Sequence, residues 1–166
     1  MKNLKITVLA FLAALIFFSG GLIAGGNNVP ETLQLETTEP EFQKLIKTLR
    51  QAAEQKKPYP IYSSISPMFR IERDFGGIFD PTANAIVNFS SSFPFDNDLL
   101  FPEYKDYGWT AFQETVSYDK FEKSPEGELC VPAGAMDVRP YPIGQLCFGR
   151  GPRNTWRINR YLKGGD

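Results

Sequence analysis

The stretch GELCVPAGAMDVRPYPIGQLCFGRGPRNTWRINRYLKGGD, residues 127–166, decides how we expect this chain to fold. Three short apolar runs bounded by Gly and Pro lie within it, and we interpret each as a strand. These runs are 129–131, 145–148 and 155–162. Cys130 stands in the first run and Cys147 in the second. A disulfide between them would fix the pairing of these two strands, and the third strand would close the structure.

The N-terminus has the layout of a secretory signal peptide. A basic start precedes an apolar run over 6–18, and small residues follow at 19–21 and 24–26. We expect cleavage after Gly26, which leaves Asn27 as the first residue; cleavage after Gly21 is the alternative. An uncleaved anchor is the other interpretation, because the apolar region approaches the length that spans a bilayer. The expected protein is bacterial and periplasmic or secreted, with membrane contact only through this segment if it is retained.

Export changes the interpretation of the two cysteines. In an oxidising compartment, a pair with this wide spacing favours a structural disulfide over a metal or redox pair, because it lacks the C-x-x-C pattern. Closing such a loop stabilises a protein by about 3 kcal/mol in the chain-entropy model. We therefore expect a disulfide between Cys130 and Cys147, no metal and no cofactor.

The length after cleavage, about 140 residues, suits one domain with its own core. The expected division is a signal peptide over 1–26, a flexible lead-in over 27–37 and a single α+β domain over 38–166. Losing the two N-terminal lysines changes the net charge from −1 to −3. Nothing in this balance indicates a nucleic-acid partner.

Charge and composition narrow the possible functions. The end of the chain is basic, which favours either an anionic partner, such as a cell-wall polymer or lipid headgroup, or simply a solvated strand face. The basic residues are Arg150, Arg153, Arg157, Arg160 and Lys163. The chain has no histidine, which excludes Ser-His-Asp and Cys-His catalysis and His-ligated zinc. An enzyme would depend on carboxylates, Tyr or Lys.

The clearest helix pattern follows the lead-in. Thr38-Glu39-Pro40-Glu41 has the form of a capping box, with Pro tolerated in the first turn. Apolar residues at helical spacing come next, and the pattern ends before Pro58. These residues are Phe42, Leu45, Ile46, Leu49, Ala52 and Ala53. A second helix is expected over 109–120, although 115–118 could equally start a strand.

The middle of the chain carries the candidate site residues. Alternation over 69–73 predicts a strand that enters a turn at Gly76-Gly77, and Asp74 before it is either a turn cap or a functional acid. The segment 80–107 is long and rich in aromatics, so it is either a binding loop or an irregular cover over the core. The candidate binding residues are Phe75, Phe93, Phe95, Tyr104, Trp109 and Arg157.

Nine residues of the C-terminal part form a recognisable sequence pattern. They are Ala135, Asp137, Val138, Arg139, Gly144, Leu146, Gly149, Trp156 and Ile158. Over 130–162 this pattern resembles the bacterial SH3-like domains of envelope proteins, with their A-x-N-V-R start, G-x-L-x-x-G turn and Trp-containing strand. Asp137 stands where that family usually has Asn. The resemblance implies an SH3-like barrel at this end.

The order of the whole chain is an amphipathic helix, the Asp74–Gly77 turn, Gly108-Trp109, Leu129–Ala133 and a last strand from Trp156. This order resembles exported bacterial proteins of uncharacterised function and the NTF2-like α+β roll. The roll implies that the helix packs on a curved antiparallel sheet around a cone-shaped pocket. It brings no catalytic residue with it, and it is the fold that we favour.

Three functions are compatible with these features. The first is a non-catalytic envelope protein that binds a protein partner or small ligand through the aromatic loop and the sheet. The second is a periplasmic inhibitor or immunity protein, for which a loop held on a rigid sheet loses little entropy on binding. The third is a carboxylate-dependent enzyme that uses Asp74 with Glu72 or Asp80, which needs one acid with a raised pKa. We favour the first.

Overall fold

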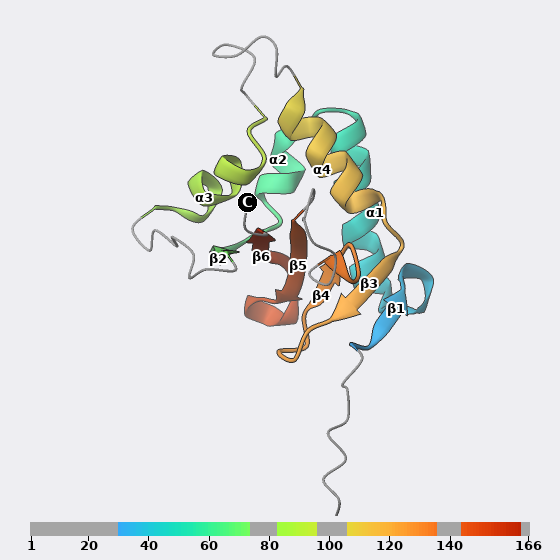
Figure 1. Cartoon of the computed structure of the whole chain (residues 1–166). Helices are drawn as coiled ribbons and strands as arrows, with labels where there is room; N and C mark the ends of the chain where they lie inside the picture. The colour runs from blue at the N-terminus through green and yellow to red at the C-terminus, as the bar shows by residue number, and fades with distance from the viewer. Residues whose placement is uncertain (1–29, 74–82, 96–105, 136–143, 164–166) are drawn as a thin grey trace, which may run out of the picture.

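The computed structural model describes residues 30–73, 83–95, 106–135 and 144–163 of the chain (Figure 1). The expected signal segment 1–26 and three candidate site residues, Asp74, Phe75 and Tyr104, lie outside the described residues. The described elements, in chain order, are β1 (Thr32–Gln34), η1 (Leu35–Thr37), α1 (Pro40–Glu54), α2 (Pro58–Tyr62), β2 (Ile65–Arg73), α3 (Ala85–Ser92), α4 (Tyr107–Ser117), β3 (Lys120–Lys123), β4 (Leu129–Val131), β5 (Gln145–Arg150), η5 (Pro152–Asn154) and β6 (Trp156–Lys163).

One six-stranded sheet organises the fold, in the order β1-β3-β4-β5-β6-β2. Neighbouring strands are antiparallel except β2 and β6, which pair in parallel. The α+β class is confirmed, but the expected wholly antiparallel sheet is wrong because the sheet is mixed. A long connection, whose described elements are α3, α4, β3, β4, β5 and η5, separates β2 from β6, so the chain can return in the same direction. The NTF2-like and SH3-like assignments stay predictions.

The expected strands at the end of the chain are present with small changes of boundary. β4 covers the predicted 129–131, β5 extends two residues beyond the predicted 145–148, and β6 replaces the predicted 155–162. The long connection over 80–107 is more regular than expected where it is described, because α3 forms within it. The Asn84 side chain accepts a hydrogen bond from the Val87 N–H at 2.9 Å and caps this helix.

Helix α1 confirms the expected apolar stripe but not its expected cap. Pro40 occupies the first turn, where its missing N–H costs nothing. The N-cap residue is Glu39, and no side-chain hydrogen bond caps the helix. The Thr38 hydroxyl instead donates to the Leu35 carbonyl at 2.6 Å, so the predicted capping box is wrong. The acceptor, the Leu35 carbonyl, belongs to η1, which lies directly before the helix.

The flexible lead-in over 27–37 is wrong for its second half. Residues Thr32–Gln34 form β1, which pairs with β3 at one edge of the sheet. Main-chain hydrogen bonds close both ends of the pair, from Leu35 to Asp119 and from Lys123 to Glu31, each at 2.7 Å. Without β1, the polar main chain of β3 would be the open edge of the sheet.

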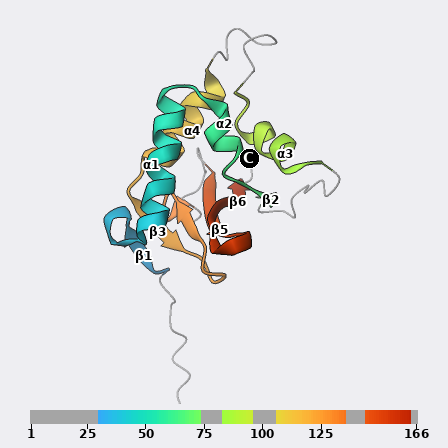
Figure 2. The same ribbon diagram turned by 180° about the vertical axis from the view of Figure 1, so that it is seen from behind.

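The core lies between the helices and one face of the sheet. Phe42, Ile46 and Leu49 of α1 are fully buried, and the Phe42 ring packs edge-on against Phe121 at 5.0 Å and Phe148 at 5.4 Å. Helix α4 lies beside α1 in both views (Figures 1 and 2). Its first residue is Tyr107 rather than the predicted 109, and it ends at Ser117, so β3 takes the last residue of the predicted helix.

A bulge in β6 decides which residues face the core. Ile158 pairs with Phe148, but the next paired residue, Arg160, is opposite Cys147, so Asn159 is the extra residue. Because neighbouring residues of β5 point to opposite faces, Ile158 lies on the helix-covered face and Arg160 on the other. Without this bulge, the alternation of a regular strand would place both side chains on one face.

Candidate functional site

Three of the aromatic residues expected to bind a ligand lie in the core. Phe93, Phe95 and Trp109 are buried, and the Phe95 ring stacks on Trp109 with 3.9 Å between ring centroids. Phe93 packs edge-on against Phe112 at 5.3 Å. These contacts hold Phe93 and Phe95 against α4. This part of the 80–107 segment therefore covers the core, which is one of the two interpretations that the sequence allowed. Direct contact of these rings with a ligand stays a prediction.

Among the expected binding residues that the structure describes, Arg157 is the most exposed. Its side chain is half-buried, and its guanidinium donates a hydrogen bond to the Ser63 carbonyl. The backbone N–H of Ile158 donates to the Ser64 carbonyl at 2.9 Å. These two bonds fasten the start of β6 to the turn before β2, so Arg157 has a structural role whether or not it also meets a ligand.

The two cysteines form the predicted disulfide. Cys130 and Cys147 stand directly opposite each other on β4 and β5, and their sulfurs are bonded at 2.05 Å. The Glu128 carboxylate lies beside them, and its oxygen and the two sulfurs are all within 4.8 Å of one another. The sulfurs are bonded to each other and cannot act as thiolate ligands, so this group does not make a metal site in the oxidised protein.

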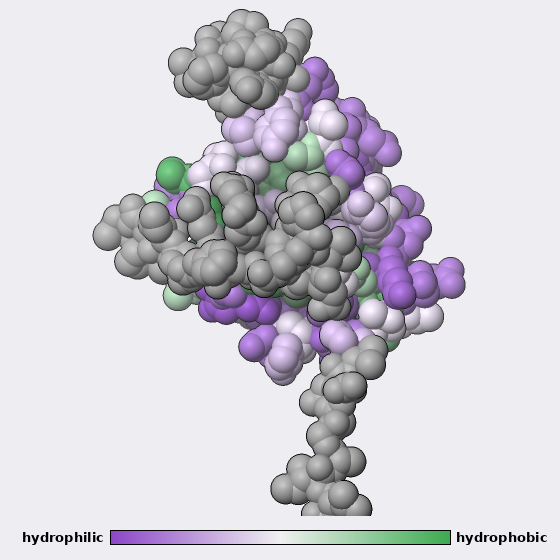
Figure 3. Space-filling view, viewed as in Figure 1, coloured by the Kyte–Doolittle hydropathy of each residue, from purple (hydrophilic) through white to green (hydrophobic). Residues whose placement is uncertain are grey.

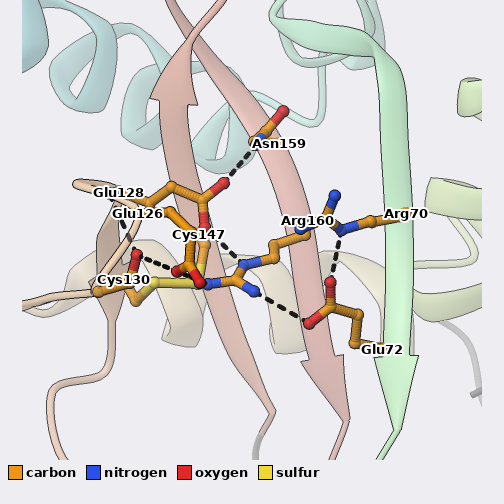
Figure 4. Close-up of polar contacts among 9 residues, drawn as sticks. Arg70, Glu72, Glu126, Glu128, Cys130, Cys147, Asn159 and Arg160 are labelled. Carbon is orange, nitrogen blue, oxygen red and sulfur yellow. Dashed lines mark hydrogen bonds and ion pairs between the residues drawn. A yellow bond between two sulfur atoms is a disulfide. The ribbon is translucent and has the colours of Figure 1, made fainter. Parts of the chain in front are cut away.

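Beside the disulfide lies a charged cluster, which we define as Arg70, Glu72, Glu126, Glu128 and Arg160 (Figure 4). Arg160 is at its centre, with 10% of its side chain exposed. Its guanidinium nitrogens lie 3.0 Å from Glu72, 3.2 Å from Glu126 and 2.5 Å from Glu128. The Glu128 side chain is only 7% exposed. The contact of Glu128 with the Arg160 Nε is an ion pair without an aligned hydrogen bond, because the N–H does not point at the oxygen.

Neighbouring groups complete the cluster. Arg70 contacts the other oxygen of Glu72 at 2.5 Å, and the Asn159 amide donates to Glu128. A Cβ on Gly149 would lie 3.1 Å from the Asn159 amide nitrogen, so glycine leaves room for this contact. Every charge of the cluster therefore has a partner, and the cluster ties the β3–β4 hairpin and β2 to β6.

The charged cluster also influences the pKa of one of its carboxylates, Glu126. The Ser124 hydroxyl, at 2.9 Å from the Glu126 carboxylate, together with the Glu126 backbone N–H and Arg160, holds the pKa of Glu126 below its usual 4.5. A lowered pKa keeps this acid ionised at neutral pH. A general acid needs the opposite shift, so Glu126 is not the acid with a raised pKa that the enzyme hypothesis requires.

A large hollow of about 810 Å³ lies between α1, η1 and the start of β3. Its walls are almost wholly polar, with Leu35 as their one apolar side chain. Arg50 in this wall is engaged, because it donates to the carbonyls of Val116 at 2.6 Å and Tyr118 at 2.9 Å and pairs with Asp119 at 2.9 Å. This arrangement closes the C-terminal end of α4 and leaves a hollow with little apolar surface for a ligand.

A second surface consists of three adjoining hollows, which we call the η5 seam. The first, about 440 Å³, lies between α1 and η5, and it shares Arg153 and Thr155 with the second, of about 350 Å³. The second shares Ile65 and Pro67 with the third, of about 380 Å³, which reaches Ile86 of α3. In Figure 2, η5 lies between α1 and β2, with α3 beyond β2. The seam therefore joins segments that are far apart in the sequence.

The two ends of the η5 seam differ in character. The end at α1 carries Lys44 and Arg153, whereas the end at α3 is lined by apolar side chains such as Ile65 and Ile86. Large apolar side chains are exposed near this second end, with Met68 76% and Val87 56% accessible. Figure 3 shows hydrophobic side chains at the surface where α3 lies in Figure 1.

Sequence reasoning identified parts of this surface but not its assembly. It marked Arg153 and Arg157 as members of a basic end and 80–107 as a segment that could bind. It missed η5 and the apolar residues of β2. The sequence feature that predicts η5 is the run Gly151-Pro152-Arg153-Asn154. It contains three residue types that are typical of turns, and it lies between two predicted strands.

Among the described residues, no helix is both long enough and apolar enough to cross a membrane. Comparison with known proteins adds no relative to this description: no protein-family model, no curated protein and no solved structure matches the chain.

Proposed function

We propose that this protein is a non-catalytic exported envelope domain that binds a protein partner through the η5 seam. The observation that carries the proposal is the exposure of apolar side chains on α3 and β2. Ile86 lines the α3 end of the seam, and Val87 and Met68, which follow the lining residues Ile86 and Pro67 in the sequence, are also accessible, although twenty other hydrophobic residues are buried together in the core. Exposed apolar side chains beside a groove are typical of interaction surfaces. The adjoining basic end supplies polar contacts that orient a partner.

The chemistry of the chain supports binding over catalysis. There is no histidine, and Glu72, a proposed catalytic partner of Asp74, is held by Arg70 and Arg160. Both carboxylate oxygens of Glu72 are therefore engaged in ion pairs within the protein. Asp74 and Asp80 lie outside the described residues, so no contact supports the enzyme hypothesis.

Export is the second part of the proposal. The buried disulfide is compatible with an oxidising compartment such as the periplasm or the extracellular space. N-terminal sequencing of the protein recovered from the envelope fraction tests the expected cleavage. A first residue of Asn27 would support export with removal of 1–26, whereas a full-length protein in the reducing cytoplasm with free thiols would contradict it.

For the fold, we propose the NTF2-like roll rather than the SH3-like barrel. Its support is a sheet of six strands whose one face is covered by α1 and α4, since a small barrel closes on itself and needs no such cover. The parallel β2–β6 pair is the feature to check in an experimental structure. A closed barrel over 130–162 would overturn this assignment.

The binding proposal is tested by site-specific crosslinking in the envelope. Val87, at the α3 end of the seam, is replaced by the photoreactive residue benzoylphenylalanine, and the matched control carries it at the exposed Lys120 of β3 near the opposite sheet edge. A single protein adduct at position 87 but not at 120 is expected, and an excess of the unlabelled protein should abolish it. The variant Val87→Ser with Met68→Ser should compete poorly.

Equal adducts at both positions, or none at position 87, would contradict the proposed surface. The identity of the captured protein separates the remaining alternatives. If it is a wall-degrading enzyme whose activity falls on binding, the protein is the inhibitor that we considered; if it is an assembly or scaffold protein, the general binding function stands.

A further inference from the structure

The η5 turn holds Arg153 in an unusual backbone conformation. Arg153 has a φ of 59° and Asn154 a φ of 58°, so both residues lie in the left-handed region. Asparagine tolerates this region, but arginine rarely adopts it, and such a residue costs about 1 kcal/mol or more. A conformation of this kind persists only when the surrounding structure enforces it.

Several hydrogen bonds enforce the η5 turn. The Gly151 N–H donates to the Thr155 carbonyl at 2.8 Å, and the Thr155 hydroxyl donates to the Pro152 carbonyl at 3.0 Å. Arg150 donates to the Asn154 carbonyl at 2.5 Å and is itself held by Glu39 and Glu41. The turn is therefore anchored to α1, and the position of Arg153 is set by its neighbours.

Arg153 stands at the junction of two hollows, because it lines both the first and the second hollow of the η5 seam. Three cations line the three hollows, namely Lys44, Arg153 and Arg157, and Glu41 is the one carboxylate among the described lining residues. Glu41 is occupied by Arg150. Within the described part of the chain, neither Lys44 nor Arg153 has an ion-pair partner.

The seam combines exposed cations with apolar lining residues. The protein is weakly acidic as a whole, with a net charge of −1, yet the seam concentrates unpaired cations beside apolar walls. Arginine recognises carboxylates through two parallel N–H groups, a charge-assisted contact that is stronger than one between neutral groups. The neighbouring Ile65 and Pro67 would accept an apolar side chain next to the anion.

We propose that Arg153 and Lys44 form an anion subsite that takes an acidic side chain of an extended peptide segment of the partner. An apolar side chain of the same segment lies in the hollow bordered by Ile65 and Pro67. The open shape of three successive hollows suits an extended chain better than an acyl tail, which requires an enclosed apolar cavity. This inference rests on the proposed function, because it names the chemistry of the partner at the same seam.

The test uses the isotope-labelled mature protein, residues 27–166, and a blocked peptide in which one glutamate is flanked by leucines. We expect saturable shifts of the Arg153 and Thr155 amides that weaken as salt is added. The matched peptide with glutamine in place of glutamate should bind about tenfold more weakly, the effect of losing one charge-assisted contact. Inorganic phosphate is titrated separately, to reveal a subsite that accepts any small oxyanion.

Protein variants separate the subsite from general electrostatics. Arg153→Ala and Lys44→Ala should each weaken the glutamate peptide about tenfold, and Arg153→Lys should lose less. The control is Lys47→Ala, which removes the same charge from α1 at a residue that lines the polar hollow instead. Thermal melts of all variants confirm that the fold is intact, because these side chains are outside the core.

Equal binding of the glutamate and glutamine peptides, or no effect of Arg153→Ala, would overturn the subsite. Phosphate binding as tight as that of the peptide would also overturn it, since the apolar hollow would then contribute nothing. These outcomes differ from failure of the proposed function. A crosslink at position 87 that survives Arg153→Ala would leave partner binding in place and remove only the acidic class of the segment.

Discussion

The charged cluster around Arg160 and the η5 seam both contain arginines, but these arginines differ in burial and in ion pairing. In the charged cluster, Arg160 contacts three carboxylates and is almost wholly buried. In the η5 seam, Arg153 is exposed, and no carboxylate among the described residues pairs with it. A buried charge that has its partners holds segments together, whereas an exposed charge without one is available to a ligand. The surroundings of an arginine therefore indicate its role better than its place in a basic stretch of sequence.

The largest expected effect comes from removing the centre of the charged cluster. Arg160→Ala leaves the nearly buried Glu128 without its cation, and loss of one partner from a buried ion pair typically costs about 3–5 kcal/mol. Urea unfolding followed by circular dichroism measures the loss. Arg153→Ala is the matched control, and it should change the free energy of unfolding by less than about 0.5 kcal/mol. Equal losses in the two variants would break the comparison between the two regions.

The disulfide beside the charged cluster has the next largest effect. Replacing both Cys130 and Cys147 by alanine should lower the free energy of unfolding by about 3 kcal/mol, because the unfolded chain regains the entropy of an open loop. The same experiment carried out on the reduced wild-type protein should give a similar loss. The glutamate peptide should bind the folded double variant as before, since the disulfide is not among the residues that line the seam. Loss of peptide binding by the folded variant would show that the disulfide affects the η5 seam, and would contradict the independence of these two regions.

A glycine substitution sharpens the contrast within the basic stretch itself. Arg153→Gly should leave the free energy of unfolding within about 1 kcal/mol of the wild type, because relief of the left-handed strain offsets the greater freedom of the unfolded chain. Arg157→Gly should cost more than about 1 kcal/mol, because it removes a strand side chain that bonds to Ser63. Both are measured by thermal melting. A larger loss for Arg153→Gly than for Arg157→Gly would contradict the assigned roles.

The smallest effect is the pH dependence due to Glu126. Its pKa is lowered in the folded state, so its contribution to stability is present above its unfolded pKa, near 4.5, and is lost as the pH falls through the folded pKa. The difference in unfolding free energy between the wild type and Glu126→Gln should therefore shrink between pH 6 and strongly acidic pH. A difference that is constant over this range would show that the carboxylate charge does not stabilise the hairpin. The effect is small because this side chain is largely exposed to solvent.

The elements that sequence reasoning predicted well are those with a local pattern. Helix α1 follows from apolar residues at helical spacing, and β4 and β5 follow from short apolar runs bounded by Gly and Pro. The disulfide follows from two cysteines that stand in predicted neighbouring strands of a chain for which we expect export. These features depend on residues close in sequence, or on a covalent bond with few possible partners.

The candidate site could be predicted only in part. The aromatic residues Phe93, Phe95 and Trp109 were proposed as a binding surface because they lie in a long connection, but this part of the connection packs them into the core. An aromatic side chain has the same identity in a core and in a ligand site, so composition does not distinguish the two. Exposure does, and it revealed Met68 and Val87, which have no distinctive pattern in the sequence.

The sequence by itself determined the strands around the two cysteines, the first helix and the absence of histidine chemistry, because each depends on local pattern or residue type. Three features arise only in the tertiary structure: the parallel pairing of β2 with β6, the bulge at Asn159, and the burial of Arg160 in contrast to the exposure of Arg153. The physical reason is that a bulge of one residue reverses the faces of a strand, and only its partner strands set where that bulge occurs.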